Sequence, residues 1–226
     1  MLKLLLKKEI RRHRLFIYIA LAVSVFCFVF SAVQGLTTGF GNQYFGSLFV
    51  KIAWSGSTMS HIALQFTLPI LAANAIASER ADRSLVFLGY LPITRSEILA
   101  PKALLLGLVC VALSVLHFVV IAAISTSSDL ATDAMLRVGV GLLYISAAGF
   151  CASGIGWCAS CIANDAATAI LVVIVLFPTV CYAQIAIALI PALEGRDFAL
   201  MTAIWVGIGL AGFAWGTRYF LSRGEL

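Results

Sequence analysis

The chain has 226 residues, of which 62% are hydrophobic and 11% are charged. Soluble domains carry about 25% charged residues, so this composition excludes an ordinary soluble domain and predicts an integral membrane protein. The length accommodates about six membrane-spanning helices with short connections, which leaves no room for a sizeable soluble domain. The net charge of +5 indicates membrane topology rather than nucleic-acid binding, because basic residues collect in cytoplasmic loops.

Residues 1–14 alternate leucines with basic residues and predict an amphipathic helix at the cytoplasmic membrane surface. One face of this helix carries Lys3, Lys7, Arg11 and Arg14. The apolar run that follows, 15–33, is longer than the roughly 7–15 residues of a signal-peptide core, so we expect it to be the first membrane span. Residues 34–60 are rich in Gly, Ser and Thr with scattered aromatic residues, which predicts a loop at the outer interface.

The stretch 77–102 is the only charged island between the long apolar runs, and its residues 78–97 are expected to be a cytoplasmic coupling segment. Glu79 and Arg83 are spaced i,i+4, which allows an ion pair along one helical face. Thr94 and Glu97 have the spacing of a capping box that opens a new helix leading into the next apolar run. The segment is therefore expected to form a helix, a break and a second helix.

The later apolar runs carry signals for close packing. Asp165 is expected to be the N-cap of the fifth span, and Pro178 is expected to bend that span. Gly212 and Gly216 form a GxxxG face on the sixth span. The fourth span has a stripe of small residues at Ala148, Ala152, Gly156 and Ser160. The expected spans are residues 15–33, 61–77, 98–124, 138–162, 166–190 and 199–221.

The distribution of basic residues predicts which loops face the cytoplasm. Only Lys51, Arg137 and Arg196 fall outside the proposed cytoplasmic side, and the other Lys and Arg residues fall on it. This asymmetry predicts an all-α polytopic protein with both termini in the cytoplasm. Without a linker or an internal repeat, residues 1–226 are expected to form a single transmembrane domain.

The charged island also resembles a known family. Its pattern is Glu79-Arg80, Leu88, Leu91-Pro92-Ile93-Thr94-Arg95-Ser96-Glu97-Ile98-Leu99 and Lys102. This pattern is similar to the cytoplasmic connection between the second and third spans of ABC-2 type permeases, the membrane subunits of ATP-driven exporters. Relatives often carry Gly at the position of Pro101, so the helix entering the third span is expected to start late or to bend there.

The resemblance implies a multi-pass permease of the inner (cytoplasmic) membrane that works as a homodimer, or as half of a heterodimer, with residues 1–14 as an elbow helix. The chain has no phosphate-binding Gly-rich loop, so ATP and Mg²⁺ are expected in a separate ABC ATP-binding subunit. No cofactor, metal or catalytic residue is expected in this chain. Membrane lipids are expected partners, nucleic acid is not, and a periplasmic accessory protein is left open. The residues expected to couple to the ATPase are Glu79, Arg80, Asp82, Arg83, Leu91, Pro92 and Arg95.

Several polar residues lie within the predicted spans, namely Gln65, Asn74, His117, Tyr182 and Gln184. Polar side chains at membrane depth usually face the bundle interior or a watery cavity. These residues are therefore candidates for lining a translocation pathway. The alternative is that they form hydrogen bonds between helices, each contributing about 0.6 kcal/mol.

Two other functions stay open at this point. Cys158 and Cys161 form a C-x-x-C pair, which a membrane thiol or quinone oxidoreductase could use. The competing interpretation is that both cysteines are small residues packed at a helix interface. A membrane anchor without transport activity could also use the charged island to hold a cytoplasmic partner.

Overall fold

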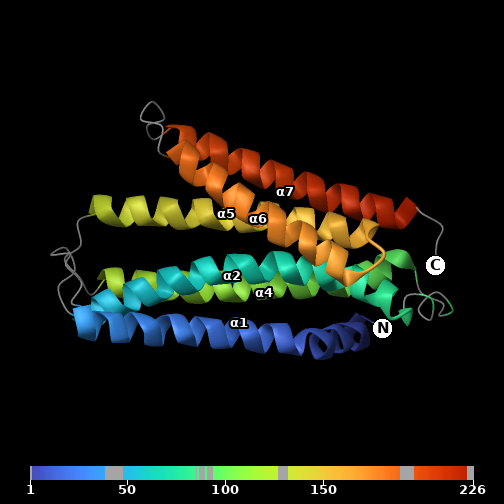
Figure 1. Cartoon of the computed structure of the whole chain (residues 1–226), viewed down its shortest axis with the longest axis horizontal. Coiled ribbons are helices and arrows are strands. Elements are labelled where there is room, and N and C mark those ends of the chain that lie inside the picture. Colours follow the sequence, from blue (N-terminus) through green and yellow to red (C-terminus); the bar gives the residue numbers. More distant parts are fainter. Residues whose placement is uncertain are drawn as a thin grey trace.

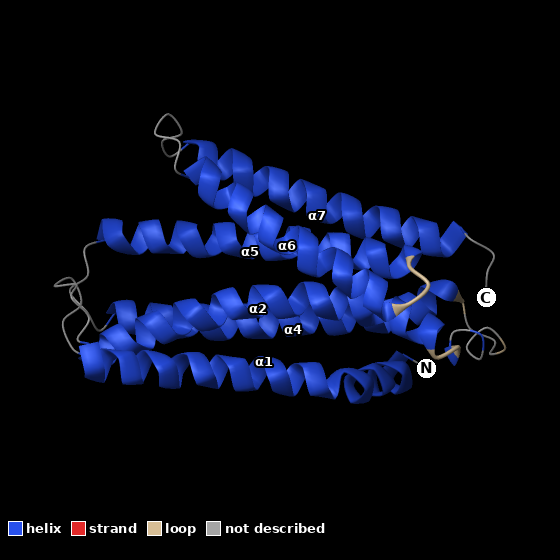
Figure 2. Cartoon of the chain, viewed as in Figure 1, coloured by secondary structure: helices blue, strands red, loops and turns tan. Residues whose placement is uncertain are grey.

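The computed structural model describes residues 2–38, 48–84, 86, 90, 94–126, 132–188 and 196–222. Its regular elements are all α-helices, and no strand occurs in these residues, which confirms the all-α prediction (Figure 2). The helices are α1 (Leu2–Thr38), α2 (Leu48–Ala81), α4 (Arg95–Thr126), α5 (Thr132–Ile162), α6 (Ala166–Ala188) and α7 (Arg196–Ser222).

Among the described residues, four helical stretches are long and apolar enough to cross a membrane. They are Lys3–Thr37, Ser55–Ala81, Leu143–Ile162 and Ala199–Ser222. A shorter apolar stretch, Ala166–Leu176, lies in α6. The chain is therefore a multi-pass membrane protein, while the count of six spans stays a prediction.

The helices run along one long axis, and the two termini lie at the same end of the bundle (Figure 1). The central helix is α2, which packs against α1, α4, α5 and α6. The most extensive helix pair is α5 with α7. The end of α2, the start of α4 and the turn between α5 and α6 lie near the termini (Figure 1). We call this end of the bundle the charged end.

Two predicted boundaries differ from the structure. Residues 2–14 are the first turns of α1 rather than a separate helix, because no glycine or proline interrupts the chain before Gly35. The loop predicted over 34–60 is wrong at both described ends, because α1 continues to Thr38 and α2 begins at Leu48. Gly56 is buried there, and a Cβ on it would lie 2.6 Å from the Phe28 ring. The small residues of this stretch thus let α2 pack closely against α1.

Glycines allow α5 and α7 to pack with their backbones in direct contact. A Cβ on Gly212 would lie 2.6 Å from the carbonyl oxygen of Gly154, and one on Gly216 would lie 2.8 Å from the Cα of Cys158. A Cβ on Gly154 would lie 2.2 Å from the Gly209 carbonyl oxygen. The predicted GxxxG face therefore packs against α5 of the same chain.

The predicted stripe of small residues on α5 faces α2. Ala148, Ala152, Gly156 and Ser160 are all buried. A Cβ on Gly156 would lie 2.6 Å from the Pro69 carbonyl oxygen. The Ser160 hydroxyl accepts hydrogen bonds from the backbone N–H groups of Ile76 and Ala77, at 2.7 and 3.0 Å. The stripe thus brings the two helices together and hydrogen bonds them near the charged end.

We expect Gly212→Ala to destabilise the protein, because its new methyl group would overlap the Gly154 carbonyl; overpacking of this kind costs about 1–3 kcal/mol. The matched control is Gly207→Ala on the same helix, where a Cβ has no atom within 4 Å. The control should be neutral or slightly stabilising, because alanine favours helix over glycine. Thermal unfolding in nanodiscs compares the two variants, and equal midpoints would contradict the packing described here.

Candidate functional site

Glu79 lies in the last turn of α2, and its side chain is fully buried although it carries a charge. Its Oε1 accepts hydrogen bonds from Lys8 Nζ at 2.8 Å and from an Arg12 guanidinium nitrogen at 3.0 Å, both on α1. Its Oε2 lies 3.0 Å from Lys102 Nζ on α4. One carboxylate therefore joins the charged ends of three helices.

Lys102 connects Glu79 to a second buried carboxylate. Its Nζ donates to Glu9 Oε1 on α1 at 2.9 Å, and both side chains are nearly completely buried. The other oxygen of Glu9 lies 3.5 Å from His13 Nε2, one helical turn along α1. Buried charges are tolerated when they are paired and hydrogen bonded. Both carboxylates are paired with Lys102 and accept hydrogen bonds at Oε1, whereas the Oε2 atoms have no hydrogen-bond partner among the described residues. We call Lys8, Glu9, Arg12, Glu79 and Lys102 the Glu79 cluster.

The edge of the Glu79 cluster reaches the surface just after α2. The Arg12 guanidinium also pairs with Asp82, whose carboxylate is more than half exposed. The next residue, Arg83, is exposed and has a φ of 56°, so the chain leaves the helix at this point. The predicted ion pair between Glu79 and Arg83 is therefore wrong, because Glu79 turns inward while Arg83 has left the helix.

Two arginines tie the segment between α2 and α4 to the other side of the bundle. Arg80 donates to the carbonyl oxygen of Ala163, just beyond the end of α5, at 2.9 Å. Arg95, the first residue of α4, donates to the carbonyl oxygens of Phe220 and Leu221 in the last turn of α7, at 3.3 and 3.2 Å. A cation is favourable at both places, because carbonyls at a helix C-terminus have no partner within the helix.

The predicted capping box at the start of α4 is confirmed. The backbone N–H of Thr94 donates to Glu97 Oε2 at 2.8 Å, and the N–H of Glu97 donates to Thr94 Oγ1 at 3.4 Å. The hydrogen bonds that the backbone N–H and the hydroxyl of Thr94 donate to Glu97 Oε2 hold the pKa of this carboxyl below its usual value. They also start α4 at Arg95, so the expectation of a late start at Pro101 is wrong.

Asp165 is the predicted N-cap of α6, and this prediction is also confirmed. Its carboxylate accepts hydrogen bonds from the backbone N–H and the hydroxyl of Thr168, both at 2.8 Å. The bonds lower the pKa of the Asp165 carboxyl. This cap lets the chain reverse direction within the short turn between α5 and α6 at the charged end.

The predicted coupling residues have different environments. Asp82 and Arg83 are exposed, Glu79 is buried, and Arg80 and Arg95 bond to other helix ends. Leu91 and Pro92 lie outside the described residues. Sequence reasoning missed the pairing with α1. The available signals were a single acid within a basic run, Glu9, and a lysine entering an apolar run, Lys102.

The predicted pathway residues Gln65 and His117 are buried inside the chain, between α2, α4 and α5. His117 Nε2 lies 2.7 Å from Ser60 Oγ, and its ring packs edge-on against that of His61. Gln65 and Ser146 both contact the His61 Nε2, at 3.4 and 2.9 Å. These contacts support the alternative role of hydrogen bonding between helices.

The remaining pathway candidates are Asn74, Tyr182 and Gln184. Asn74 is half-buried on α2, and its backbone carbonyl accepts a hydrogen bond from Ser78 Oγ at 2.7 Å. The side chains of Tyr182 and Gln184 lie outside the described residues.

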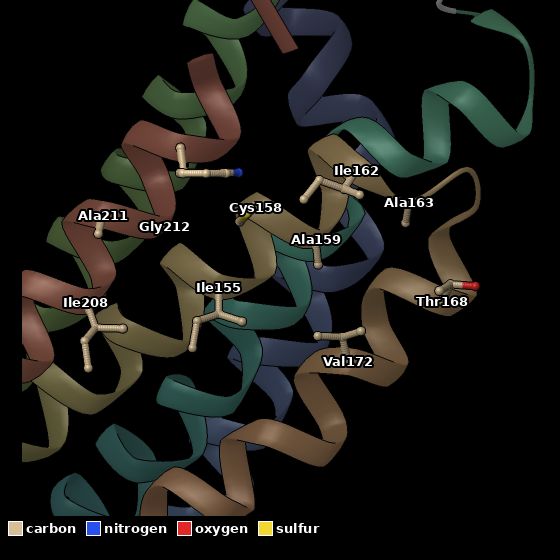
Figure 3. Close-up of a pocket in the computed structure, with 11 residues that line it drawn as sticks. Ile155, Cys158, Ala159, Ile162, Ala163, Thr168, Val172, Ile208, Ala211 and Gly212 are labelled. Carbon is tan, nitrogen blue, oxygen red and sulfur yellow. The ribbon is translucent and has the colours of Figure 1, made fainter. Parts of the chain in front are cut away.

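Cys158 and Cys161 lie on α5 as free thiols. Cys161 is fully buried in the core cluster, which also contains Trp157 and Ile76. Cys158 lines an apolar groove of about 670 Å³ between α5, α6 and α7 on the outside of the bundle (Figure 3). The burial of Cys161 agrees with a packing role and gives a quinone no access to that thiol.

We expect Glu79→Gln to destabilise the protein by about 3–5 kcal/mol, because three cations around it lose their shared counter-charge. The control is Glu97→Gln, an exposed acid at the same end whose replacement still fits a capping box. Thermal unfolding of both variants in nanodiscs tests this. An unfolding midpoint of the Glu79 variant equal to that of the control would show that the cluster adds no stability.

A comparison of the sequence with known families assigns the chain to one of them. The sequence model described as ABC-2 family transporter protein matches residues 5–192, more than half of the chain. No curated protein and no solved structure matches the chain. The matched range contains the Glu79 cluster and the whole segment between α2 and α4. The chain therefore belongs to the ABC-2 transporter family and is a permease, the membrane part of an ABC transporter.

Proposed function

We propose that the chain is the permease subunit of an ATP-driven exporter of the cytoplasmic membrane. Two copies form the transporter, and a separate ATP-binding subunit docks on the charged end of each copy. Family membership supports the need for an ATPase, and the position of both termini at the charged end supports an even number of spans (Figure 1). The concentration of basic residues at that end supports its cytoplasmic location.

The observation that carries this proposal is the burial of Glu79 directly beside an exposed segment. The chain emerges at Asp82 and Arg83, within four residues of a carboxylate that binds both α1 and α4. A partner that moves the segment must therefore move the end of α2 and, through Glu79, the ends of α1 and α4. Paired charges in a low-dielectric site resist separation, so the three helix ends move together.

The arginine contacts extend this connection to the rest of the bundle. Arg80 binds the end of α5, and Arg95 binds the end of α7. Motion of the segment between α2 and α4 thus reaches five helices through side chains that the structure describes. In this proposal Asp82 and Arg83 contact the ATPase, whereas Glu79, Arg80 and Arg95 transmit the movement.

The test uses the exposed residues, because changes at Glu79 would also destabilise the protein. The tagged chain is co-expressed with an ABC ATP-binding subunit from the same organism, purified and assayed for ATP hydrolysis in nanodiscs. We expect Asp82→Lys with Arg83→Glu to reduce recovery of the ATPase by about tenfold or more, because like charges placed across an interface cost several kcal/mol. The unfolding midpoint of this variant should fall only slightly, because the ion pair that Asp82 forms with Arg12 is partly exposed and contributes about 1 kcal/mol or less.

The matched control is Arg218→Glu, which reverses an exposed charge on α7 at the same end. It should retain the ATPase within about twofold, since it lies outside the proposed docking segment. Full ATPase recovery with the Asp82 and Arg83 variant would place the docking surface elsewhere. If no ATPase co-purifies with the wild-type chain, the chain is an anchor or acts otherwise, and the proposed function is wrong.

A further inference from the structure

The first turns of α1 carry basic residues on two faces that differ in their surroundings. Lys8 and Arg12 face the bundle and belong to the Glu79 cluster. The other face carries Lys3, Lys7, Arg11 and Arg14, which we call the basic stripe. All four residues are exposed, and within the described part of the chain none of them forms an ion pair.

The spacing of the basic stripe is unfavourable for an isolated helix. Lys3, Lys7 and Arg11 follow one another at i,i+4, and Arg14 follows Arg11 at i,i+3. Like charges at these spacings repel each other and destabilise a helix. Glu9 is the one acid in the first fourteen residues, and its carboxylate is buried against Lys102. Within the described residues the basic stripe has no counter-charge, so anions from outside the chain can neutralise it.

The position of the basic stripe indicates where these anions come from. A helix of 37 residues is about 55 Å long, whereas the hydrocarbon core of a membrane is about 30 Å thick. Most of the exposed apolar side chains on α1 lie from Leu15 onward, Tyr18 and Val25 among them. The stripe directly precedes this lipid-facing surface, so Arg11 and Arg14 lie at the level of the phospholipid phosphates. Lys7 and Lys3 follow further out along the helix axis. Lys and Arg side chains there can also extend along the apolar residues Leu4 and Ile10.

We propose that the basic stripe binds the headgroups of anionic phospholipids in the leaflet at the charged end. Phosphate groups neutralise the repulsion along the stripe, and the adjoining apolar face of α1 contacts the acyl chains of the same lipids. Lys8 and Arg12 lie on the same turns of α1 as the basic stripe. Lipids that bind the stripe therefore also fix the position of the two side chains that bind Glu79. Anionic lipid thus stabilises the Glu79 cluster. This inference requires insertion in a membrane and does not depend on ATPase docking.

The experiment places the chain in nanodiscs of phosphatidylcholine mixed with phosphatidylglycerol and measures the lipids retained on it by native mass spectrometry. Lys7→Gln with Arg11→Gln removes two charges from the stripe. The matched control, Arg83→Gln with Arg218→Gln, removes two exposed charges from the same end of the bundle. A cation near an anionic surface contributes about 1 kcal/mol, so the stripe variant should lose roughly tenfold or more of its phosphatidylglycerol enrichment. The control should keep most of it.

Thermal unfolding gives an independent measurement. The wild type should unfold at a higher temperature in phosphatidylglycerol than in phosphatidylcholine, and the stripe variant should lose this difference. Inorganic phosphate added to phosphatidylcholine nanodiscs should not replace the lipid, since the proposed ligand is held by its acyl chains as well. Equal enrichment in the stripe variant and the control, or full stabilisation by inorganic phosphate alone, would overturn the proposal.

If the stripe variant fails to fold, the salt dependence of lipid binding to the wild-type chain still tests the proposal. The screening length falls from about 10 Å at 0.1 M salt to about 3 Å at 1 M. Phosphatidylglycerol enrichment on the wild-type chain should therefore fall steeply over this range. Enrichment that does not change with salt would show that the basic stripe is not the binding surface.

Discussion

Burial of the Glu79 carboxylate is the constraint on which the charged end of this permease depends. A charge removed from water is stable only when counter-charges surround it, so Lys8, Arg12 and Lys102 must converge on it. These residues belong to two other helices, and their positions therefore fix how α1 and α4 meet α2. The same requirement extends to Glu9, which shares Lys102. Charge pairing thus determines how the ends of α1, α2 and α4 pack together.

The other side of the bundle is held by a different type of contact. Glycines bring α5 and α7 to backbone contact, and small residues on α5 bring it against α2. Such contacts replace the hydrophobic effect, which does not drive helices together in lipid. Because α5 and α7 pack this closely, we treat the two helices as one structural unit. Arg80 and Arg95 then connect this unit to the segment between α2 and α4.

The two halves suggest how one end of a permease serves both its partner and its membrane. Asp82 and Arg83 are exposed at the edge of the Glu79 cluster, where we propose that the ATP-binding subunit docks. The basic stripe lies on the far face of α1, where lipid can reach it. In the two proposals, both surfaces would act on Glu79 through residues one helical turn away or less. A change in either environment therefore bears on the same buried ion pairs.

Local spacing in the sequence determined the membrane class, the helical content, the capping box at Thr94 and the cap at Asp165, because each depends on residues close together in the chain. The sequence also identified the small-residue stripe on α5 and Gly212 with Gly216, although not which helices they would contact. Only the tertiary structure decided the partner of Glu79. Arg83 has the helical spacing for an ion pair with Glu79, but the chain leaves the helix before Arg83. Glu79 instead pairs with cations such as Lys8, which is 71 positions away in the sequence. Burial made that distant pairing necessary, and spacing along the chain carries no information about it.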